Sequence, residues 1–359
     1  FTNGLEKTSL TPSAAQALNQ KILQYFANHG YPFASVQLKV VKWKNDTIIT
    51  EVKIDKGPEI TIDSLVVKGI ESLNPSVIEK YTQIKPGDLY DQSEINQANN
   101  RLNRLGYLQM TGRPAMIFSK EKNILYLYGK YNSANRFDGL VGLNTEPDGK
   151  TYFTGDLDLQ LQNIFKNGES IGLAWNSPGG GSQELNFKVK WPFLFKTPLG
   201  ISLGFDLFRR DSTFANRDIQ LGLSYLISPE LSINMGYEWF STNTLGSGSS
   251  TSTINSAQSN WFTVGAEYKN YIGDIIPRKG WAGNFTLGQG RRTAEGLNQS
   301  VYKVLVNIER FESLYLNHHL YLQGRVKFLY GSNFYENEMY REGGIKSFRG
   351  FNEQTIITT

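Results

Sequence analysis

Arg349 has the most distinctive chemical setting in the chain. It lies in a glycine-rich stretch near the end, which reads Tyr340-Arg-Glu-Gly-Gly-Ile-Lys-Ser-Phe-Arg-Gly-Phe351. The Gly343-Gly344 pair permits a backbone turn that a residue with a Cβ atom resists. Such a loop can direct one guanidinium, with its five donors, into a confined space to bind a carboxylate or a ring face. The alternative is an ordinary surface loop whose arginine lies in water, and these residues alone do not distinguish the two.

The other residues that could do chemistry do not converge on a catalytic site. His318-His319 are adjacent and would point to opposite faces of a strand, which is poor geometry for a metal ion or for acid–base work. His29 stands at the end of an expected helix, where an interaction with the helix dipole is the simpler explanation. Pro178-Gly-Gly-Gly181 lacks the strand–helix setting of a phosphate-binding loop. We therefore predict no enzyme, no catalytic residue, no metal site and no cofactor.

The composition favours β structure in more than one domain. The 359 residues exceed the usual size of a single core, and 19 Tyr, 21 Phe and 35 Gly are typical of β proteins. The net charge of +4 comes with no basic stripe, which argues against a nucleic-acid partner. No apolar run of about 20 residues is present, so no transmembrane helix is expected. Because the chain opens at Phe1 without a signal-peptide pattern, we expect an N-terminal portion to be absent.

The first third of the sequence contains a repeated unit. A helix is expected over residues 11–29, with Thr11 as its N-cap, followed by strands over 35–43 and 47–54 joined at Asn45-Asp46. The pattern then returns more completely as a strand over 60–67, helices over 74–81 and 91–105, and strands over 107–118 and 124–131. Asp91 is the expected N-cap of the longer helix. Residues 59–132 thus form a β-α-α-β-β module, and residues 1–57 match the end of another one.

From Gly139 onward, apolar and polar residues alternate with period two, which indicates β-strands. The runs predict about eleven strands, several of them near the length that crosses a membrane. Four of these runs are clear, at 185–191, 201–207, 231–239 and 320–328; the others start near Gly139, Tyr152, Ile171, Ile219, Phe262, Trp281 and Tyr302.

A soluble β-sandwich would give the same period, but two observations favour a membrane barrel. One strand face is apolar throughout, whereas the opposite face is charged at Lys188, Lys190, Asp206, Glu238, Glu267, Lys303, Glu309, Arg325 and Lys327. Aromatic residues also stand near strand ends, as in an interfacial girdle. They are Trp175, Trp191, Trp239, Tyr268 and Trp281.

The connections between strands alternate in length, as they do in outer-membrane barrels. The longer ones are expected at 208–217, 241–260 and 289–300 and at the Arg349 loop, which would be the sixth on the outer side. About eleven strands leave two unpaired edges, which hydrocarbon does not tolerate, and bacterial barrels have even strand numbers. We therefore expect the native chain to continue past Thr359, or a second polypeptide to supply the remaining strands.

In this order and spacing, the chain resembles the outer-membrane insertases and translocators built from POTRA modules followed by a barrel, the BamA/TamA-like superfamily that also includes the two-partner secretion transporters. The β-α-α-β-β repeats look like POTRA modules, with Lys56-Gly-Pro-Glu-Ile60 at their junction. Ile276-Pro-Arg-Lys-Gly280 is similar to a barrel element of the family. Gly343-Gly-Ile-Lys-Ser-Phe-Arg-Gly-Phe351 is similar to the signature of the sixth outer loop, which folds back into the lumen.

The resemblance implies a fold of α+β POTRA modules followed by an antiparallel transmembrane β-barrel that is incomplete in this chain. Residues 1–57 would be the C-terminal part of one POTRA module and residues 58–133 a complete one. Residues 134–359 would be the barrel, with about its first eleven strands and the inward-folding sixth outer loop.

The resemblance also implies three functional elements. The loop signature comprises Gly343, Gly344, Ser347, Phe348, Arg349, Gly350 and Phe351, with Arg349 reaching the inner barrel wall. The first strand of a lateral gate comprises Gly139, Leu140, Val141, Gly142 and Leu143, where the glycines would weaken pairing or simply curve the barrel. A strand edge for client or partner binding comprises Tyr107, Leu108, Gln109 and Met110. An inert edge blunted by Pro114 is the alternative there.

As function, the resemblance implies an outer-membrane protein assembly factor. Its periplasmic POTRA modules would receive unfolded β-barrel clients, and a lateral seam would insert them into the membrane. The alternative is a two-partner-type translocator that exports one dedicated substrate through the lumen; a passive pore would not explain the modules. The expected partners are client proteins, periplasmic chaperones or accessory lipoproteins, and the lipid bilayer, without nucleic acid. The expected location is the bacterial outer membrane.

Overall fold

The computed structural model describes residues 11–44, 47–145, 149, 151–246, 253–272, 277–315, 318–331, 333–343, 350 and 356–358. The chain divides into two compact units. One contains the residues up to Glu71 together with Tyr81–Asn103 and Leu108–Tyr131, and the other contains Ser72–Lys80, Arg104–Tyr107 and the chain from Asn132 onward. No helix in the described part is long and apolar enough to cross a membrane.

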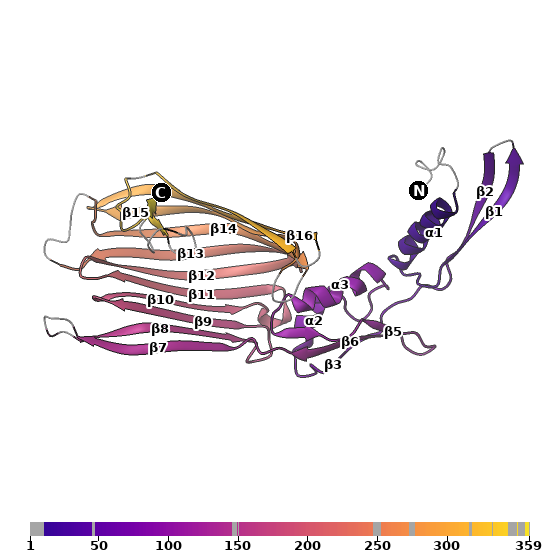
Figure 1. The fold of residues 1–359 in the computed structure, drawn as a ribbon, viewed down its shortest axis with the longest axis horizontal. Helices are drawn as coiled ribbons and strands as arrows, with labels where there is room; N and C mark the ends of the chain where they lie inside the picture. Colours follow the sequence, from indigo (N-terminus) through magenta and orange to yellow (C-terminus); the bar gives the residue numbers. More distant parts are fainter. Residues whose placement is uncertain are drawn as a thin grey trace. The chain divides into compact units, whose positions relative to one another are not determined.

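The first elements are a helix and a hairpin (Figure 1). Helix α1 spans Pro12–Ala27, and the side-chain oxygen of Thr11 accepts a hydrogen bond from the Ala14 amide at 3.2 Å, which confirms the expected N-cap. Strands β1 (Ser35–Lys44) and β2 (Thr47–Asp55) pair antiparallel as a two-stranded sheet. The predicted turn at Asn45-Asp46 lies outside the described residues.

A β-α-α-β-β module follows, built around its last strand. Its elements are β3 (Ser64–Lys68), α2 (Pro75–Thr82), α3 (Gln92–Asn103), β4 (Leu108–Met110), β5 (Ala115–Ile117) and β6 (Ile124–Tyr131). Strand β6 is central, parallel to β3 on one side and antiparallel to β4 and β5 on the other. Asp91 caps α3 as predicted, because its carboxylate accepts from the amides of Ser93 and Glu94 at 2.8 and 3.2 Å.

Alternating apolar positions on the strands and one face of α3 meet in the buried interior of the module. The interior side chains of this unit include Ile62, Ile70, Ile84, Ile95, Ala98, Leu102, Leu125 and Leu127, each less than a tenth exposed. Packing in this interior holds β4 and β5 on the side of β6 opposite β3.

Two predicted strands of the module differ in the structure. The strand expected over residues 60–67 begins only at Ser64, because residues 60–62 instead pair with the segment 87–90: the amide of Ile62 donates to Asp88 O at 2.8 Å. The strand expected over residues 107–118 is broken into β4 and β5. Gly112 and Pro114 lie in the gap between them, and proline cannot donate a ladder hydrogen bond.

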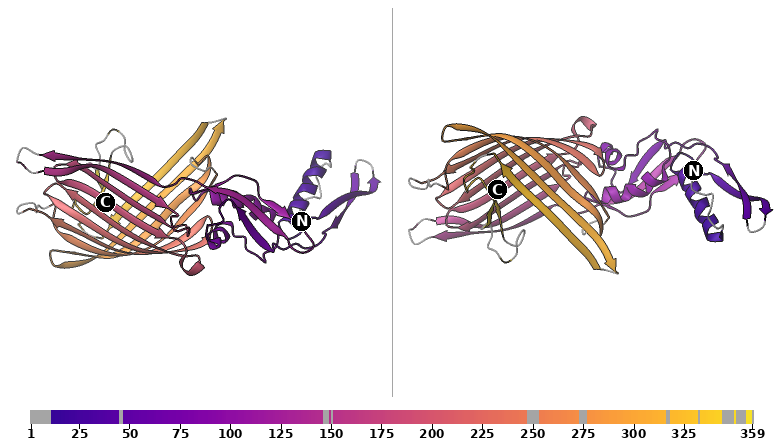
Figure 2. Two further views of the ribbon diagram at one scale, coloured as in Figure 1. Left: turned by 90° about the horizontal axis from the view of Figure 1, so that it is seen from below. Right: turned by 90° about the horizontal axis from the view of Figure 1, so that it is seen from above.

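The second unit is dominated by an antiparallel sheet, eleven-stranded within the described residues (Figures 1 and 2), which confirms the predicted fold class. Its strands follow one another in sequence order as β7 (Arg136–Thr145), β8 (Thr151–Gln162), β9 (Ser170–Gly179), β10 (Ser182–Trp191), β11 (Leu199–Arg210), β12 (Phe214–Ser228), β13 (Leu231–Thr244), β14 (Ala257–Ile272), β15 (Lys279–Ala294), β16 (Leu297–Tyr315) and β17 (His318–Tyr330). The sheet curves into an open barrel, with β7 and β17 at its edges.

Strand register divides the sheet into an apolar face and a polar face. Asp206 lies opposite Asp218, and Gln220 lies opposite Glu238, so these side chains share the polar face. On the other face the apolar side chains are exposed, including Ile201, Leu203, Ile219, Leu221, Leu223, Tyr225, Met235, Trp239, Phe262, Val264, Trp281, Phe285 and Leu287. A continuous apolar surface of this kind is what a bilayer covers.

Two expected loops turn out to be strand. Strand β11 continues to Arg210 and β12 begins at Phe214, so the loop predicted at 208–217 is reduced to residues 211–213. Likewise β15 and β16 are joined at residues 295–296, where residues 289–300 were expected to be loop. Backbone pairing continues beyond the stretches whose apolar alternation is clear, because ladder hydrogen bonds do not depend on side-chain polarity.

Candidate functional site

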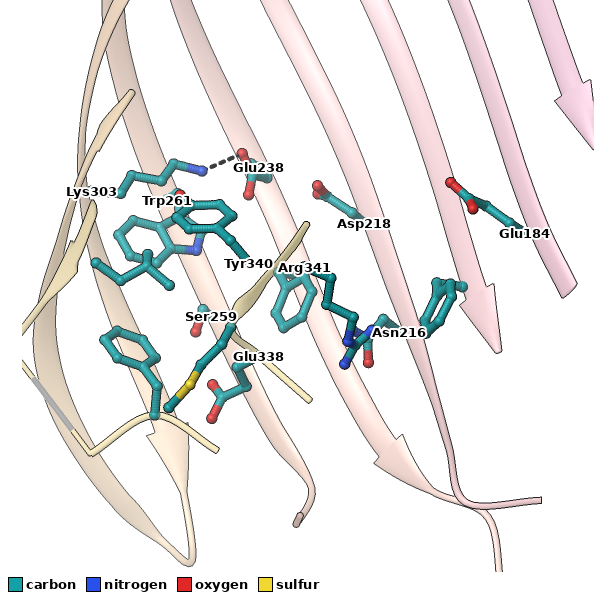
Figure 3. Close-up of a pocket in the computed structure, with 15 residues that line it drawn as sticks. Glu184, Asn216, Asp218, Glu238, Ser259, Trp261, Lys303, Glu338, Tyr340 and Arg341 are labelled. Atoms are coloured by element: carbon teal, nitrogen blue, oxygen red, sulfur yellow. Dashed lines mark hydrogen bonds and ion pairs between the residues drawn. The ribbon is translucent and has the colours of Figure 1, made fainter. Parts of the chain in front are cut away.

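The polar face of the barrel sheet carries a short segment of the chain on it. After β17, residues 333–343 (here called the luminal segment) turn back along this face, and their last part is β18 (Tyr340–Glu342). β18 pairs antiparallel with β19 (Ile356–Thr358), the register running from Tyr340↔Thr358 to Glu342↔Ile356. Figure 3 shows the luminal segment among side chains of β10 to β14, β16 and β17.

A buried ion pair holds the middle of the luminal segment. The Arg292 guanidinium of β15 donates from Nε and Nη2 to the Glu338 carboxylate, with the shortest contact at 2.6 Å. The rings of Phe334 and Tyr335 lie 5.6 and 4.8 Å from the same guanidinium. The Tyr335 hydroxyl donates to Glu295 at 2.9 Å, and burial together with this bond raises the pKa of Tyr335, so it remains a donor at neutral pH.

Asn337 is the second attachment point, and it is fully buried. Its side-chain amide donates to Thr242 Oγ1 at 2.6 Å and to the Asn255 carbonyl at 2.8 Å. Its own carbonyl accepts from Asn216 Nδ2 at 2.6 Å, and Thr242 in turn donates to Asn216 at 2.7 Å. Four residues from separate parts of the chain are thus joined in one satisfied polar network, an arrangement that favours a single conformation.

Further contacts follow toward the end of the segment. Glu342 accepts from Lys327 of β17 at 2.6 Å. The Arg341 guanidinium lies over the rings of Phe208 and Phe214, 4.7 and 4.8 Å from their centroids. Burial lowers the pKa of Arg341 to about 10, which leaves it cationic at neutral pH.

An apolar cluster on the otherwise polar face completes the attachment. Phe334 packs with Trp261, Val301 and Leu329, all less than a tenth exposed. Beside this cluster, Lys303 donates to Glu238 at 2.6 Å and lies over the Trp261 ring. The remaining cavity of about 300 Å³ is bounded by Asp218, Glu238, Tyr340, Arg341 and their neighbours (Figure 3).

The predicted loop signature is only partly within the described residues. Gly343 and Gly350 have φ values of +125° and +95°, a backbone conformation that favours glycine. Gly344, Ser347, Phe348, Arg349 and Phe351 lie outside the described residues, so the role of Arg349 stays a prediction. The luminal segment ends at Gly343, immediately before this stretch.

The five residues predicted for the lateral gate, Gly139, Leu140, Val141, Gly142 and Leu143, all lie in β7. Strand β7 pairs with β8 along its whole length, and within the described residues no strand pairs with its other side. Opposite Val141, Gly155 of β8 has a φ of +138°, and a Cβ atom there would come within 1.9 Å of the Leu140 carbonyl oxygen. The two strands approach so closely at this point that only glycine fits.

The predicted module edge comprises the whole of β4 and the residue before it, namely Tyr107, Leu108, Gln109 and Met110. The Thr111 amide donates to Tyr128 of β6 at 2.8 Å, so by strand alternation the Met110 amide points away from β6. That amide donates to the side chain of Asn103 in α3 at 2.7 Å. Asn99, one turn earlier in α3, donates to the Gly112 carbonyl at 2.7 Å. The outward backbone groups of Met110 and Gly112 are therefore already bonded to α3.

Comparisons with known proteins identify one module and support the resemblance of the whole chain. Residues 60–128 match the family model described as POTRA, surface antigen variable number repeat. The outer membrane protein assembly factor BamA of Nitratidesulfovibrio vulgaris is 24% identical over 132 residues, which are 36% of this chain and 17% of that protein. The chain thus contains a POTRA module and is similar to outer-membrane proteins that join POTRA modules to a barrel.

Three solved structures have a similar fold. BamA from Haemophilus ducreyi lacking POTRA domains 1–3 aligns with a TM-score of 0.51 and 18% identity, over 96% of this chain and 70% of that one. CdiB from Acinetobacter baumannii aligns with a TM-score of 0.56 and 13% identity, over 97% of this chain and 66% of that one. CdiB from Escherichia coli aligns with a TM-score of 0.54 and 12% identity, over 95% of this chain and 66% of that one. This chain thus spans about two thirds of each solved chain and a smaller part of the curated relative.

The sequence did not indicate the residues that hold the luminal segment: Arg292, Asn337 and Glu338. The sequence contained one signal that a segment packs on the polar face. Trp261 lies on the polar face of β14, opposite Glu238, and an aromatic side chain among charges indicates that something apolar packs there. Arg292 carries no such signal, because residues 289–300 were expected to form a loop, where an exposed charged side chain is ordinary. The described part of the chain contains no group of His, Cys, Asp or Glu side chains arranged to hold a metal ion.

Proposed function

We propose that this protein is an outer-membrane protein assembly factor of bacteria, which receives unfolded β-barrel proteins and inserts them into the membrane. The name of its curated relative, an assembly factor, supports this function. We assign residues 1–57 to the C-terminal part of one POTRA module, 58–133 to a complete module and 134–359 to the barrel. In this proposal the modules lie in the periplasm.

Client capture is assigned to the module edge that begins with Tyr107, Leu108, Gln109 and Met110. An extended client can add to such an edge by backbone hydrogen bonding. Because Asn99 and Asn103 already bond to Gly112 and Met110, the client must displace these side chains. Client binding would then be weak and reversible, which suits a relay from periplasmic chaperones or accessory lipoproteins.

Insertion is assigned to β7, and one observation carries this step. Strand β7 has backbone pairing on one side only among the described strands, and its Gly139 and Gly142 lack the side chains that would reinforce pairing on the other side. A client strand could add to this edge and pass outward into the bilayer. The driving force would be the client's own burial and strand pairing, without nucleotide or metal.

The luminal segment would support insertion by fixing the loop that follows it. Glu338 and Asn337 attach this segment to strands β12, β13 and β15. We assign to Arg349 a contact with the inner wall that keeps the loop in its working conformation. The loop signature residues Gly343, Gly344, Ser347, Phe348, Arg349, Gly350 and Phe351 would act together in this role.

A second candidate function is export of one dedicated protein through the lumen, as a two-partner-type translocator. The observation that favours it is the fold similarity to the two CdiB structures, which is at least as high as that to BamA. In that case the luminal segment would have to leave the lumen to open a path.

Depletion of the protein in its host, followed by quantitative proteomics of the outer membrane and the medium, distinguishes the two functions. Loss of many unrelated barrel proteins from the outer membrane is the result expected for an assembly factor. Loss of a single exported protein, with the other barrels intact, would replace this proposal by the dedicated translocator.

A further inference from the structure

Two turns at one end of the barrel sheet expose large apolar side chains. They are the turn of residues 163–169 between β8 and β9 and the turn of residues 192–198 between β10 and β11, here called the anchor turns; Figure 1 shows the strands they join. Phe195 is 92% exposed, Phe165 59% and Ile164 43%. Both turns lie at the end of the sheet where β7 begins.

The first anchor turn is rigidly built. Glu169 is only 1% exposed, and its carboxylate accepts from the amides of Phe165 and Asn167 at 2.5 and 3.1 Å. Asn163, 3% exposed, accepts from the Gly168 amide at 2.9 Å through its side chain. Buried polar groups therefore fix the backbone that presents Ile164 and Phe165. The exposure of these apolar side chains is a feature of an ordered turn.

The second anchor turn holds its phenylalanine in an unfavourable backbone conformation. Phe195 and Lys196 have φ values of +51° and +62°, in the left-handed region that bulky residues rarely adopt. The Thr197 hydroxyl donates to the Leu194 carbonyl at 2.7 Å and so closes the turn. This backbone conformation places the phenyl ring of Phe195 almost entirely outside the protein. It indicates a second environment for the ring.

The Phe165 ring lies on the apolar outer face of the sheet. The Phe165 ring stacks on Trp191, with 5.9 Å between ring centroids and planes 23° apart. Trp191 lies opposite Ile201, on the face that also carries Leu185, Phe187 and Val189. The apolar surface that a bilayer covers therefore continues from β10 onto the first turn. Lys196, exposed beside Phe195, adds a positive charge where lipid phosphates would lie.

We propose that the two anchor turns insert into the interfacial region of the phospholipid leaflet on this side of the membrane, with Phe165 and Phe195 among the upper acyl chains and Lys196 at the phosphates. Amphipathic elements of this composition lie in the interface rather than cross it. The turns follow β8 and β10, near β7, which has no second pairing strand among the described residues. Their insertion fixes the depth of this part of the sheet in the leaflet, whether the protein inserts clients or exports them.

Fluorescence quenching in vesicles tests this proposal with the full-length protein. The 359 residues contain no cysteine, so Phe195→Cys and, separately, Phe165→Cys can each carry one polarity-sensitive nitrobenzoxadiazole label. Lys120→Cys, an exposed position in the module, is the matched control. Each labelled protein is reconstituted in phosphatidylcholine–phosphatidylglycerol vesicles, and heat-modifiable gel mobility establishes that the barrel is folded. Brominated lipids and aqueous iodide then serve as the two quenchers.

We expect the labels at 195 and 165 to emit at shorter wavelength than the label at 120. Lipids brominated near the glycerol should quench them, at a depth of roughly 5–10 Å, and iodide should not. Quenching by iodide alone at both positions would overturn the proposal, since the turns would then lie in water. Shielding from both quenchers would also overturn it, because protein would then cover the turns.

Discussion

The carboxylate of Glu338 receives hydrogen bonds of 2.6, 2.8 and 3.1 Å from the guanidinium of Arg292, and the two side chains are 2% and 4% exposed. The pair joins the luminal segment to β15 on the polar face of the barrel. Removal of one partner leaves an uncompensated charge in a buried site. It therefore lowers the stability of the folded protein more than removal of both partners does.

Glu338→Ala should therefore release the luminal segment. Loss of one partner of a buried pair costs about 3–5 kcal/mol. We expect a lower temperature of heat modification on gels and faster proteolysis near residue 338. Glu267→Ala, which breaks the more exposed pair with Lys269 (34% and 52% exposed), is the control and should cost about 0–1 kcal/mol. Equal effects of the two variants would show that the Arg292–Glu338 pair does not hold the segment.

Asn337→Asp tests the polar network without a change of side-chain shape. The substitution removes the side-chain amide that donates to Thr242 Oγ1 and to the Asn255 carbonyl. It also places a carboxylate against that carbonyl. An unsatisfied buried polar group costs about 1–3 kcal/mol, more for a charge. The same substitution at the exposed Asn270 should leave proteolysis of the luminal segment unchanged. If both variants resist proteolysis as the unaltered protein does, Asn337 is not an attachment point.

The fold was largely predictable from the sequence because its signals are local. Thr11 and Asp91 stand at helix starts, and the alternation from Gly139 onward depends only on next-nearest neighbours in a strand. The departure of residues 60–62 from strand β3 was not predictable in this way. It depends on pairing with the segment 87–90, more than twenty residues away along the chain.

The candidate site was less predictable, because its contacts join distant residues. Glu338 meets Arg292 across 46 positions, and Asn337 meets Asn216 across 121. Nothing in the local pattern distinguishes Arg292 from Arg291, its neighbour in the same strand. Only the aromatic Trp261 on a polar face indicated where an inward segment would pack. The edge at Met110 was predicted as a strand, but its bond to Asn103 required the arrangement of α3 beside it.

Gly155→Ala should disrupt the pairing of the first two barrel strands. A Cβ atom there would lie 1.9 Å from the Leu140 carbonyl oxygen, and the φ of +138° is unfavourable for alanine. We expect faster amide hydrogen exchange in β7 and a lower temperature of heat modification. Gly172→Ala in β9, where a Cβ atom would meet nothing within 4 Å, is the matched control and should change neither. An unaltered exchange rate in the Gly155 variant would mean that β8 does not set the conformation of β7.

Gly142→Ala separates a gate role from simple packing. A Cβ atom at Gly142 would make only ordinary contacts, at 3.6 Å or more, so the folded barrel should accept alanine. If weak pairing at β7 is needed for client insertion, this variant should fold normally yet insert clients more slowly, measured as the rate of client heat modification in reconstituted vesicles. Normal barrel stability with normal insertion would favour the simpler explanation, that the glycine serves barrel curvature alone.

Asn103→Ala should open the module edge. The substitution removes the acceptor of the Met110 amide, a bond of 2.7 Å whose net contribution is about 0.5–1.5 kcal/mol. We expect the Met110 amide to exchange roughly 2- to 10-fold faster, and an unfolded client to crosslink more efficiently to a photoreactive residue at Gln109 of the full-length protein. Asn96→Ala, on the same helix but bonded only to Gln92 among the contacts described here, is the control. Faster exchange without increased crosslinking would mean that the edge is accessible but is not where clients bind, and the capture step would then belong to another part of the chain.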